Sequence, residues 1–313
     1  MEMAWLEDFL AILECGGFSR AAERRNVTQP ALSRRIRALE QWVGTPLLDR
    51  STHAVTLTPA GQIFRVTAED LLRRLQLGRD AALEAASTAS ETLRFASTHA
   101  LSLTFFPGWL RGLEASMPDG IVVQLVADTM AACERTMIQG DAQFLLCHHH
   151  PAAPTTLEPG QFLSVPVGHD VLLPVSAPIE PGTPLPRHSL PGSPEAPVPH
   201  LAYRAESGMG RITASALAAD GSPVWLKPVF SSHLATLLVT MAIEGRGISW
   251  SPKSLVSEAL ALGTLVRAGN SAWDIPMEIR LLRSRARQSP AAERFWALVK
   301  DEEIRNNLIL SSI

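Results

Sequence analysis

The chain has 313 residues, 46% of them hydrophobic and 19% charged, with a net charge of −3 at pH 7. This length and composition are typical of a globular protein of about two domains and exclude a disordered or collagen-like chain. Neither a secretory signal nor an uncharged run long enough to cross a membrane is apparent. The three cysteines, Cys15, Cys133 and Cys147, are widely spaced. They indicate a reducing compartment without structural disulfides, so we expect a cytoplasmic protein.

The N-terminal residues predict a first helix over residues 4–14, because apolar side chains recur there at helical spacing. A second helix follows over residues 19–25, with Ser19 as its N-cap and two small residues, Ala21 and Ala22, that permit close packing. Asn26 tolerates the left-handed conformation that a tight turn between helices requires. These features predict two short helices, with a tight turn at Asn26 after the second.

A third helix is predicted to begin after Thr28, a suitable N-cap, with Pro30 in its first turn. Its apolar stripe has the spacing i, i+4, i+7, i+11 and consists of Leu32, Ile36, Leu39 and Val43. A short helix, a tight turn and a helix with a polar N-terminal end are typical of a helix-turn-helix.

Positive charge is concentrated in this region: residues 18–40 contain six arginines and two glutamates, although the whole chain is slightly acidic. Arg and Gln side chains on the third helix suit base edges, whereas the remaining arginines suit phosphates. A solvated basic helix face is the alternative. The residues expected to contact double-stranded DNA are Arg20, Arg24, Arg25, Thr28, Gln29, Pro30, Ser33, Arg34, Arg35, Arg37, Arg50 and His53.

The next segments predict a wing and a long linker helix. Alternating apolar residues around a polar turn, at 48–57, indicate a short hairpin that carries Arg50 and His53. From Pro59 to about Ala86 an apolar series steps by 4, 3, 4, 3, 4, and it consists of Phe64, Ala68, Leu71, Leu75, Gly78 and Ala82. This spacing predicts a seam for helix pairing between two chains, and packing against its own domain is the alternative. We expect a homodimer or homotetramer, with domain boundaries at 1–58, 59–90 and 91–313.

Beyond the small, polar hinge at 85–92, strands and helices alternate, which predicts an α/β fold. The first set comprises strands at 92–98, 120–127 and 142–148, with helices at 103–116 and 130–140. The second comprises strands at 170–176, 199–205, 226–232 and 248–252, with helices at 210–221 and 234–247. A last strand and helix, at 276–284 and 290–302, are predicted to return to the first lobe. Residues 174–199 hold nine prolines and predict an extended surface excursion of the second lobe.

Two α/β lobes predict a cleft, and ligands in such sheets bind at the carboxyl ends of strands. The effector-binding candidates at those ends are Ser97, Thr98, His99, Ser102, Tyr203, Arg204, Ser207, Met209, Ser231, Ser232 and His233. The last three are expected to begin a helix. Simple N-capping is the alternative for each serine.

The run from Cys147 to His150, "CHHH", is the sequence most suggestive of metal binding. Consecutive strand residues alternate faces and do not converge on one ion, so we expect a loop at a strand end and no metal. A metal-dependent enzyme using this run is a further alternative. The chain lacks GxSxG, Walker and GxGxxG motifs, so we expect no enzyme and no cofactor.

The pattern "LEDFLAI…GGFSRAAERRNVTQPALSRRIRALEQWVGTPLLDR…VTLTPAG" resembles the LysR-type transcriptional regulators across residues 5–61. The resemblance implies an N-terminal all-α winged helix-turn-helix, a linker helix for dimerisation and a C-terminal two-lobed α/β effector domain like a periplasmic binding protein. It also implies sequence-specific DNA binding that the C-terminal domain modulates.

Five stretches, "HALSL", "SGMGR", "FSSHLATLL", "GRGISWSP" and "AERFW", resemble the hypochlorite-responsive branch of that family. This resemblance implies regulation by methionine oxidation, with Met117 and Met209 as sensing residues and His233 in place of a third methionine. The alternative signal is a small anionic metabolite bound between the lobes. Ordinary packing is the alternative role for both methionines.

Overall fold

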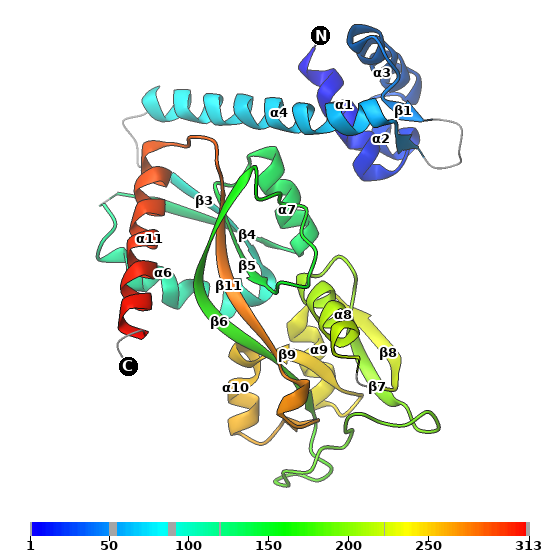
Figure 1. The fold of residues 1–313 in the computed structure, drawn as a ribbon, viewed down its shortest axis with the longest axis vertical. Helices are drawn as coiled ribbons and strands as arrows, with labels where there is room; N and C mark the ends of the chain where they lie inside the picture. The colour runs from blue at the N-terminus through cyan, green and yellow to red at the C-terminus, as the bar shows by residue number, and fades with distance from the viewer. Residues whose placement is uncertain (1, 50–54, 87–91, 119, 222, 311–313) are drawn as a thin grey trace. The chain divides into compact units, whose positions relative to one another are not determined.

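The computed structural model describes residues 2–49, 55–86, 92–118, 120–221 and 223–310. The chain divides into two compact units, Met1–Ala86 with Ile138–Asp141, and Ser87–Met137 with Ala142–Ile313 (Figure 1). The predicted DNA contacts Arg50 and His53 lie outside the described residues. Within the described ranges, no helix is both long and apolar enough to cross a membrane.

The N-terminal unit is a three-helix bundle followed by a two-stranded hairpin and a long helix. Its elements are α1 (Met3–Cys15), α2 (Phe18–Arg24), α3 (Gln29–Val43), β1 (Leu48–Asp49), β2 (Thr56–Leu57) and α4 (Pro59–Ala86). The bundle core is built from the apolar stripes that the sequence predicts, and Leu32, Ile36 and Leu39 of α3 are fully buried. The turn after α2 has Asn26 at φ 52°, which confirms the left-handed turn residue. Ser19 does not cap α2, because the helix begins one residue earlier, after Gly17.

The first turns of α4 pack against the bundle of their own chain. Ala68 is fully buried in the bundle core, and Phe64 and Leu72 pack against it. The predicted pairing seam is therefore wrong at Phe64 and Ala68, since the hairpin returns α4 across the bundle. Farther along the same stripe Leu71 and Leu75 are 42% and 55% exposed.

The C-terminal unit contains a seven-stranded sheet of order β10-β6-β11-β5-β3-β4, with β9 also paired to β6. The strands are β3 (Thr92–Thr98), β4 (Val122–Asp128), β5 (Phe144–His149), β6 (Phe162–Ser176), β7 (Val198–Tyr203), β8 (Leu226–Ser232), β9 (Ser249–Pro252), β10 (Val266–Arg267) and β11 (Ile275–Ser284). The helices are α5 (His99–Thr104), α6 (Phe106–Glu114), α7 (Met130–Gln139), α8 (Gly208–Asp220), α9 (Ala235–Ile243), α10 (Lys253–Ala261), η1 (Ser271–Trp273) and α11 (Pro290–Leu310).

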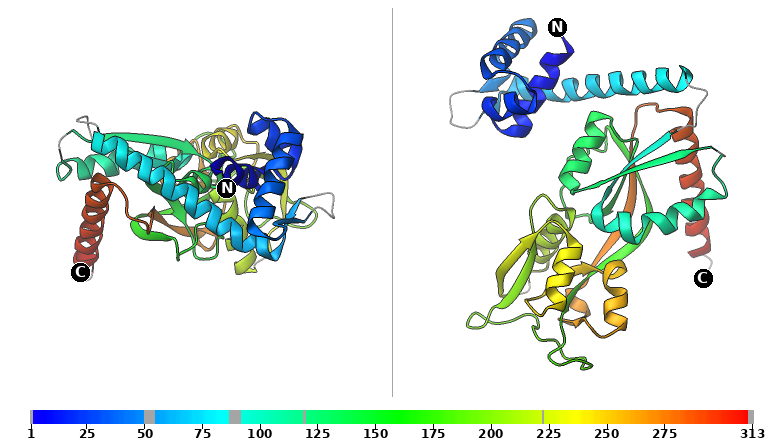
Figure 2. Two further views of the ribbon diagram at one scale, coloured as in Figure 1. Left: turned by 90° about the horizontal axis from the view of Figure 1, so that it is seen from above. Right: turned by 180° about the vertical axis from the view of Figure 1, so that it is seen from behind.

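Two long antiparallel strands, β6 and β11, run through this unit and join its two lobes (Figures 1 and 2). Lobe I contains β3, β4, β5 and the strand halves beside them. Lobe II is the segment 177–274, which includes the parallel pair β7 and β8. The sequence missed the first half of β6 and helix α10. Because β11 pairs with both β5 and β6, the prediction that the last strand returns to the first lobe is confirmed.

Lobe I is stabilised by an aromatic core under α6 and α11. The Phe95 ring stacks on Phe144 with ring centroids 5.1 Å apart and meets Phe106 and Phe295 edge-on at 5.3 and 5.4 Å. The single helix predicted at 103–116 is wrong. The chain forms two helices instead, because the conformation changes at Phe105, where φ is −115° and ψ is −49°.

A buried ion pair ties the two lobes together. Glu134 on α7 is 2% exposed, and its Oε1 accepts a hydrogen bond from Arg211 Nη1 on α8 at 2.9 Å. The same oxygen accepts from Thr155 Oγ1 at 2.9 Å and from the Thr156 amide at 3.0 Å. Three donors therefore satisfy this buried carboxylate, which stabilises the contact between α7 and α8.

Candidate nucleic-acid interface and interlobe cavity

The solvent-facing side of α3 presents most of the predicted base-reading residues. Gln29, Arg34 and Arg37 are exposed, and Ser33 is partly exposed. Arg34 and Arg37 lie on the side of the helix away from Leu32, Ile36 and Leu39, and Gln29 lies at its exposed N-terminal end. In the described part of the chain, no ion pair or hydrogen bond engages the side chain of Gln29, Arg34 or Arg37. The same is true of Arg20 on α2. These side chains are free to contact an external partner.

The other three arginines of this region are held by carboxylates of α1. Arg25 Nε donates to Asp8 Oδ1 at 2.9 Å, and Arg35 Nη1 donates to Asp8 Oδ2 at 3.1 Å. Asp8 is completely buried, and Arg25 also pairs with Glu7 at 2.5 Å. Arg25 and Arg35 therefore hold α1, α2 and α3 together, and their contacts with phosphates stay a prediction.

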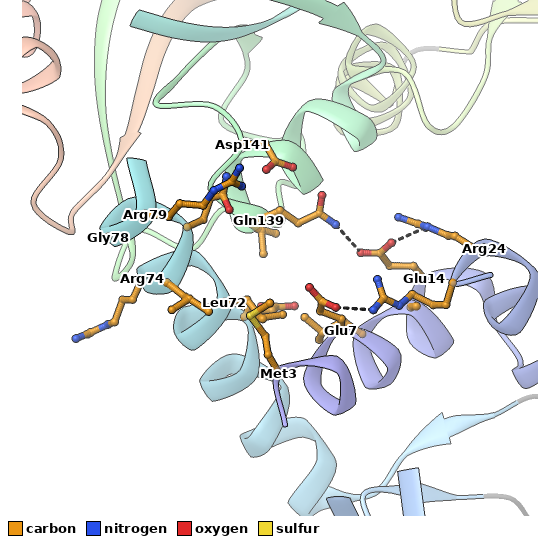
Figure 3. A pocket seen from close by; sticks show the side chains of 17 residues that line it. Met3, Glu7, Glu14, Arg24, Leu72, Arg74, Gly78, Arg79, Gln139 and Asp141 are labelled. Carbon is orange, nitrogen blue, oxygen red and sulfur yellow. Dashed lines mark hydrogen bonds and ion pairs between the residues drawn. The ribbon is translucent and has the colours of Figure 1, made fainter. Parts of the chain in front are cut away.

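Arg24 is also engaged within the unit. Its Nη1 lies 2.6 Å from Glu14 Oε2, and Figure 3 draws this ion pair with Glu14 on α1. The same view shows Glu7 and Met3 of α1 near Leu72 of α4. Because the Arg24 side chain is 48% exposed, its pairing is weaker than that of Arg25. Its contact with a phosphate stays a prediction.

The start of α3 follows the predicted boundary. Thr28 is the N-cap residue in an extended conformation, and Pro30 lies in the first turn. Thr28 makes no side-chain capping hydrogen bond, so its hydroxyl is not consumed by the helix. Thr28, Gln29 and Pro30 are all exposed at this helix end.

A small cavity of about 30 Å³, here called the interlobe cavity, lies in the C-terminal unit. Strand β3 is parallel to both β4 and β5, so the carboxyl ends of these strands meet at one edge of the sheet. Of the predicted effector residues, the cavity brings together Thr98, His99, Ser207, Met209 and His233. The rings of His99 and His233 have centroids 5.9 Å apart.

Among the lining residues that sequence reasoning missed, four carry a polar or sulfur-containing side chain: Asp128, Thr129, Met130 and His148. They lie at the ends of β4 and β5 or directly after β4. The strand-end rule used for β3 would have found them if it had been applied to all three strands.

The remaining predicted effector residues do not line the cavity. Ser97 is fully buried in β3, the Ser102 hydroxyl donates to the His99 carbonyl at 2.8 Å, and Arg204 pairs with Glu206 at 2.8 Å. Tyr203 packs in the core of lobe II, where burial raises its pKa.

The residues expected to begin a helix after β8 lie at the end of this strand or between it and α9. Ser231 and Ser232 belong to the strand itself, and His233 precedes α9. The Ser232 hydroxyl accepts from the Leu234 amide at 3.1 Å, and the Ser207 hydroxyl accepts from the Gly210 amide at 3.5 Å. Ser207 therefore caps α8, as the capping alternative expects, whereas Ser232 closes the turn before α9, whose N-cap residue is Leu234.

The two predicted sensing methionines lie in different places. Met209 is 6% exposed and borders the interlobe cavity, whereas Met117 follows α6 and packs against the core of lobe I. Met130, from α7, borders the cavity together with Met209. The structure therefore places Met130, rather than Met117, beside Met209.

His148 is held by a buried carboxylate. Its Nε2 lies 3.4 Å from Asp170 Oδ2, and both side chains are at most 3% exposed. Asp170 also accepts from the Val171 amide at 2.8 Å, the Ser254 amide at 3.2 Å and the Ser254 hydroxyl at 2.5 Å. Burial alone would raise the Asp170 pKa, but hydrogen bonds, first from His148 and then from Ser254, bring it below its ordinary value.

The Cys147–His150 run lies mostly in β5 rather than in a loop, which corrects that prediction. Cys147, His148 and His149 pair with β11 opposite Arg280, Ile279 and Glu278. Across the described ranges, no group of three or more His, Cys, Asp or Glu side chains is arranged to hold a metal ion. Burial raises the pKa of both Cys133 and Cys147 to about 12, so neither thiol is a reactive thiolate at neutral pH.

Comparison with known families matches both units. Residues 3–62 match the bacterial regulatory helix-turn-helix protein, lysR family, and residues 86–303 match the LysR substrate binding domain. The chain is similar to the HTH-type transcriptional regulator YjiE of Escherichia coli (strain K12), with 31% identity over 97% of this chain and 96% of that protein. It is also similar to the SDS degradation transcriptional activation protein of Pseudomonas sp. (strain ATCC 19151), with 27% identity and 97% of each chain covered.

Two solved structures are similar over nearly the whole chain. HypT from Salmonella typhimurium, described as a hypochlorite-specific LysR-type transcriptional regulator, has 29% identity and a TM-score of 0.57, covering 97% of this chain and 99% of that one. DarR from Vibrio fischeri, solved in complex with DNA, has 30% identity and a TM-score of 0.54, covering 96% of this chain and 98% of that one.

Proposed function

The chain belongs to the LysR family of DNA-binding transcriptional regulators, and we propose that it reads its operator with the exposed face of α3. The relatives are regulators rather than enzymes. The observation that carries the proposal is the division of the six arginines in the helix-turn-helix. Arg24, Arg25 and Arg35 are paired with carboxylates of α1. Arg20, Arg34 and Arg37 are left for DNA.

Charge and side-chain chemistry give these residues different roles. Gln29 and Arg34 project from the N-terminal half of α3 and Arg37 from just past its middle, and in this motif the N-terminal part of the helix enters the major groove. Arg suits guanine, and Gln suits adenine. Arg20 on α2 suits a phosphate. If a dimer contacts about six phosphates, log affinity should fall against log salt with a slope of about −5.

The first experiment is a fluorescence-anisotropy titration of the full chain on DNA from its own upstream region. Arg34→Ala should weaken specific binding by about 1–3 kcal/mol and relax the sequence preference at one base position. Arg65→Ala is the matched control, because it removes the same charge from α4, where Arg65 pairs with Glu69 at 2.7 Å. Equal losses in the two variants would contradict base reading by Arg34.

We also propose that two chains pair through exposed apolar residues of α4. Leu71 and Leu75 continue the stripe that packs on the bundle and are 42% and 55% exposed. Pairing would bury these side chains and match two half-sites on DNA. Leu75→Glu should shift the mass measured by light scattering toward the single chain and weaken binding to a two-half-site operator more than to one half-site.

For the signal, we propose that the C-terminal domain responds to an oxidant at the interlobe cavity, with Met209 as the residue oxidised. Similarity to HypT over the full chain favours this signal, and oxidation would make an apolar side chain at the cavity wall polar. Mild hypochlorite should change the affinity measured by anisotropy. Methionine sulfoxide reductase should reverse the change, and Met209→Ile should abolish it.

The alternative signal is a small anionic metabolite in the same cavity. It is favoured by the polar side chains of Thr98, His99 and His233 at the cavity wall. A response to metabolites that survives Met209→Ile but is lost in Thr98→Val would favour this alternative over the oxidant.

A further inference from the structure

Two buried polar atoms that border the interlobe cavity have no protein partner. They are Nδ1 of His148 and Oγ1 of Thr98, and none of the described residues offers either of them a hydrogen bond. A buried polar atom without a partner destabilises the folded state, so such atoms in a native fold call for an explanation. The interlobe cavity, whose lining also includes the apolar side chains of Met130 and Met209, therefore offers two unsatisfied polar groups to a ligand.

The position of the imidazole proton follows from Asp170. Three groups donate hydrogen bonds to its carboxylate, the Val171 amide, the Ser254 amide and the Ser254 hydroxyl, and His148 Nε2 lies 3.4 Å from Oδ2. A carboxylate so surrounded is ionised and can only accept. His148 Nε2 must therefore carry a proton.

His148 Nδ1 is then left as a lone pair. A second proton on this nitrogen would place a charged donor without a partner in a side chain that is 2% exposed, which costs more than an unpaired lone pair. The neutral ring with Nε2–H fits this site, and its free nitrogen accepts hydrogen bonds and cannot donate them.

We propose that the interlobe cavity binds a small neutral hydroxylic molecule that donates its proton to Nδ1 of His148 and shares a second hydrogen bond with Thr98. The volume of about 30 Å³ suits a molecule of one or two heavy atoms. His99 and His233, which line the same cavity, can donate to the remaining lone pair of the hydroxyl oxygen. This inference rests on the proposed signalling role of the cavity and specifies the chemistry of its ligand.

The proposal is tested by nuclear magnetic resonance on the full chain with ¹⁵N-labelled histidine, using methanol as a neutral probe and bromide as an anionic probe. His148→Gln identifies the His148 signals by their loss. Before any addition, Nε2 should be protonated and Nδ1 should not. Methanol should then move the Nδ1 signal in a saturable way, and bromide should leave it unchanged.

Two isosteric variants sharpen the result. Thr98→Val removes the hydroxyl without removing any hydrogen bond that the fold uses and should weaken methanol binding about tenfold. Asp170→Asn presents an amide donor to Nε2, which should move the imidazole proton to Nδ1. The cavity should then bind bromide in preference to methanol. Thermal unfolding of each variant shows whether it is folded.

A protonated Nδ1 in the unmodified protein overturns the proposal, as does a bromide response in place of the methanol response. An Nδ1 signal that methanol leaves unchanged also overturns it and indicates a resident water only. The signalling role fails separately, if neither oxidant nor metabolite changes the DNA affinity while the His148 results hold.

Discussion

Asp8 should be the most sensitive charged residue of the DNA-binding unit. It is completely buried on α1, and its two carboxylate oxygens hold Arg25 at 2.9 Å and Arg35 at 3.1 Å. Asp8→Ala removes two charge-assisted hydrogen bonds, each worth about 1.5–3 kcal/mol. The two arginine side chains are 29% and 36% exposed and can be partly rehydrated. We therefore expect a loss of about 2–4 kcal/mol.

Amide hydrogen exchange of the full chain measures this loss locally, because opening of one unit is read from its own peptides. A loss of 2–4 kcal/mol corresponds to exchange that is roughly 30- to 700-fold faster in α2 and α3. Peptides from β5 and β11 should not change. DNA affinity should also fall, because α3 loses its orientation. The fall is expected even though Asp8→Ala removes a negative charge that repels DNA.

Glu14→Ala is the matched control for Asp8→Ala. It also removes a carboxylate of α1 paired with an arginine of α2, but this pair is exposed, at 24% and 48%. Such surface pairs contribute about 0–1 kcal/mol. If Asp8→Ala accelerates exchange no more than Glu14→Ala does, the inference that the buried carboxylate organises the helix-turn-helix is refuted.

Three further predictions concern the C-terminal unit. Glu134→Ala should lower its unfolding free energy in urea by about 3–5 kcal/mol, because one partner of a buried ion pair is lost, whereas Glu134→Gln should cost less. Ionised Asp170 should stabilise the folded state fully above its unfolded pKa of about 4. This stabilisation should disappear as the pH falls through the lower pKa of the folded state. The urea midpoints of wild type and Asp170→Asn should therefore converge in acid. A thiol reagent at pH 8 should label the partly exposed Cys15 before Cys133 and Cys147. Burial and a pKa of about 12 protect these two thiols until the C-terminal unit unfolds. Rapid labelling of either buried cysteine in the native protein would contradict this order.

Local features of the helix-turn-helix could be predicted from the sequence because each depends on residues close together in the chain. The apolar stripe of α3 and the turn at Asn26 are decided by spacing and by the backbone preference of one residue. The role of Arg25 and Arg35 could not be predicted in this way. Their partner, Asp8, lies 17 and 27 residues away, and an acidic residue in an amphipathic helix is normally exposed.

The same limit applies to α4 and to the cavity. Phe64 and Ala68 fit a pairing seam by spacing, but spacing does not say whether the stripe meets another chain or the bundle of its own chain. In the C-terminal unit, the strand-end rule located Thr98 and His99 correctly at the start of α5. It could not say that His148 would be aligned by Asp170, since that contact depends on how β5 and β6 are placed around β11.

The path of the chain through β6 and β11 has a consequence for the evolution of this protein. The chain leaves lobe I along β6 and returns along β11, and the register places Leu172 opposite Ile275 at the crossing. Lobe II is therefore a continuous insertion whose two ends are neighbours in an antiparallel pair. Such an insertion can be exchanged or shortened without rethreading the first lobe. Selection can thus remodel the half of the cavity that Met209 and His233 contribute while the strand ends of the other half stay in place, so that a new signal can be acquired by exchanging one segment.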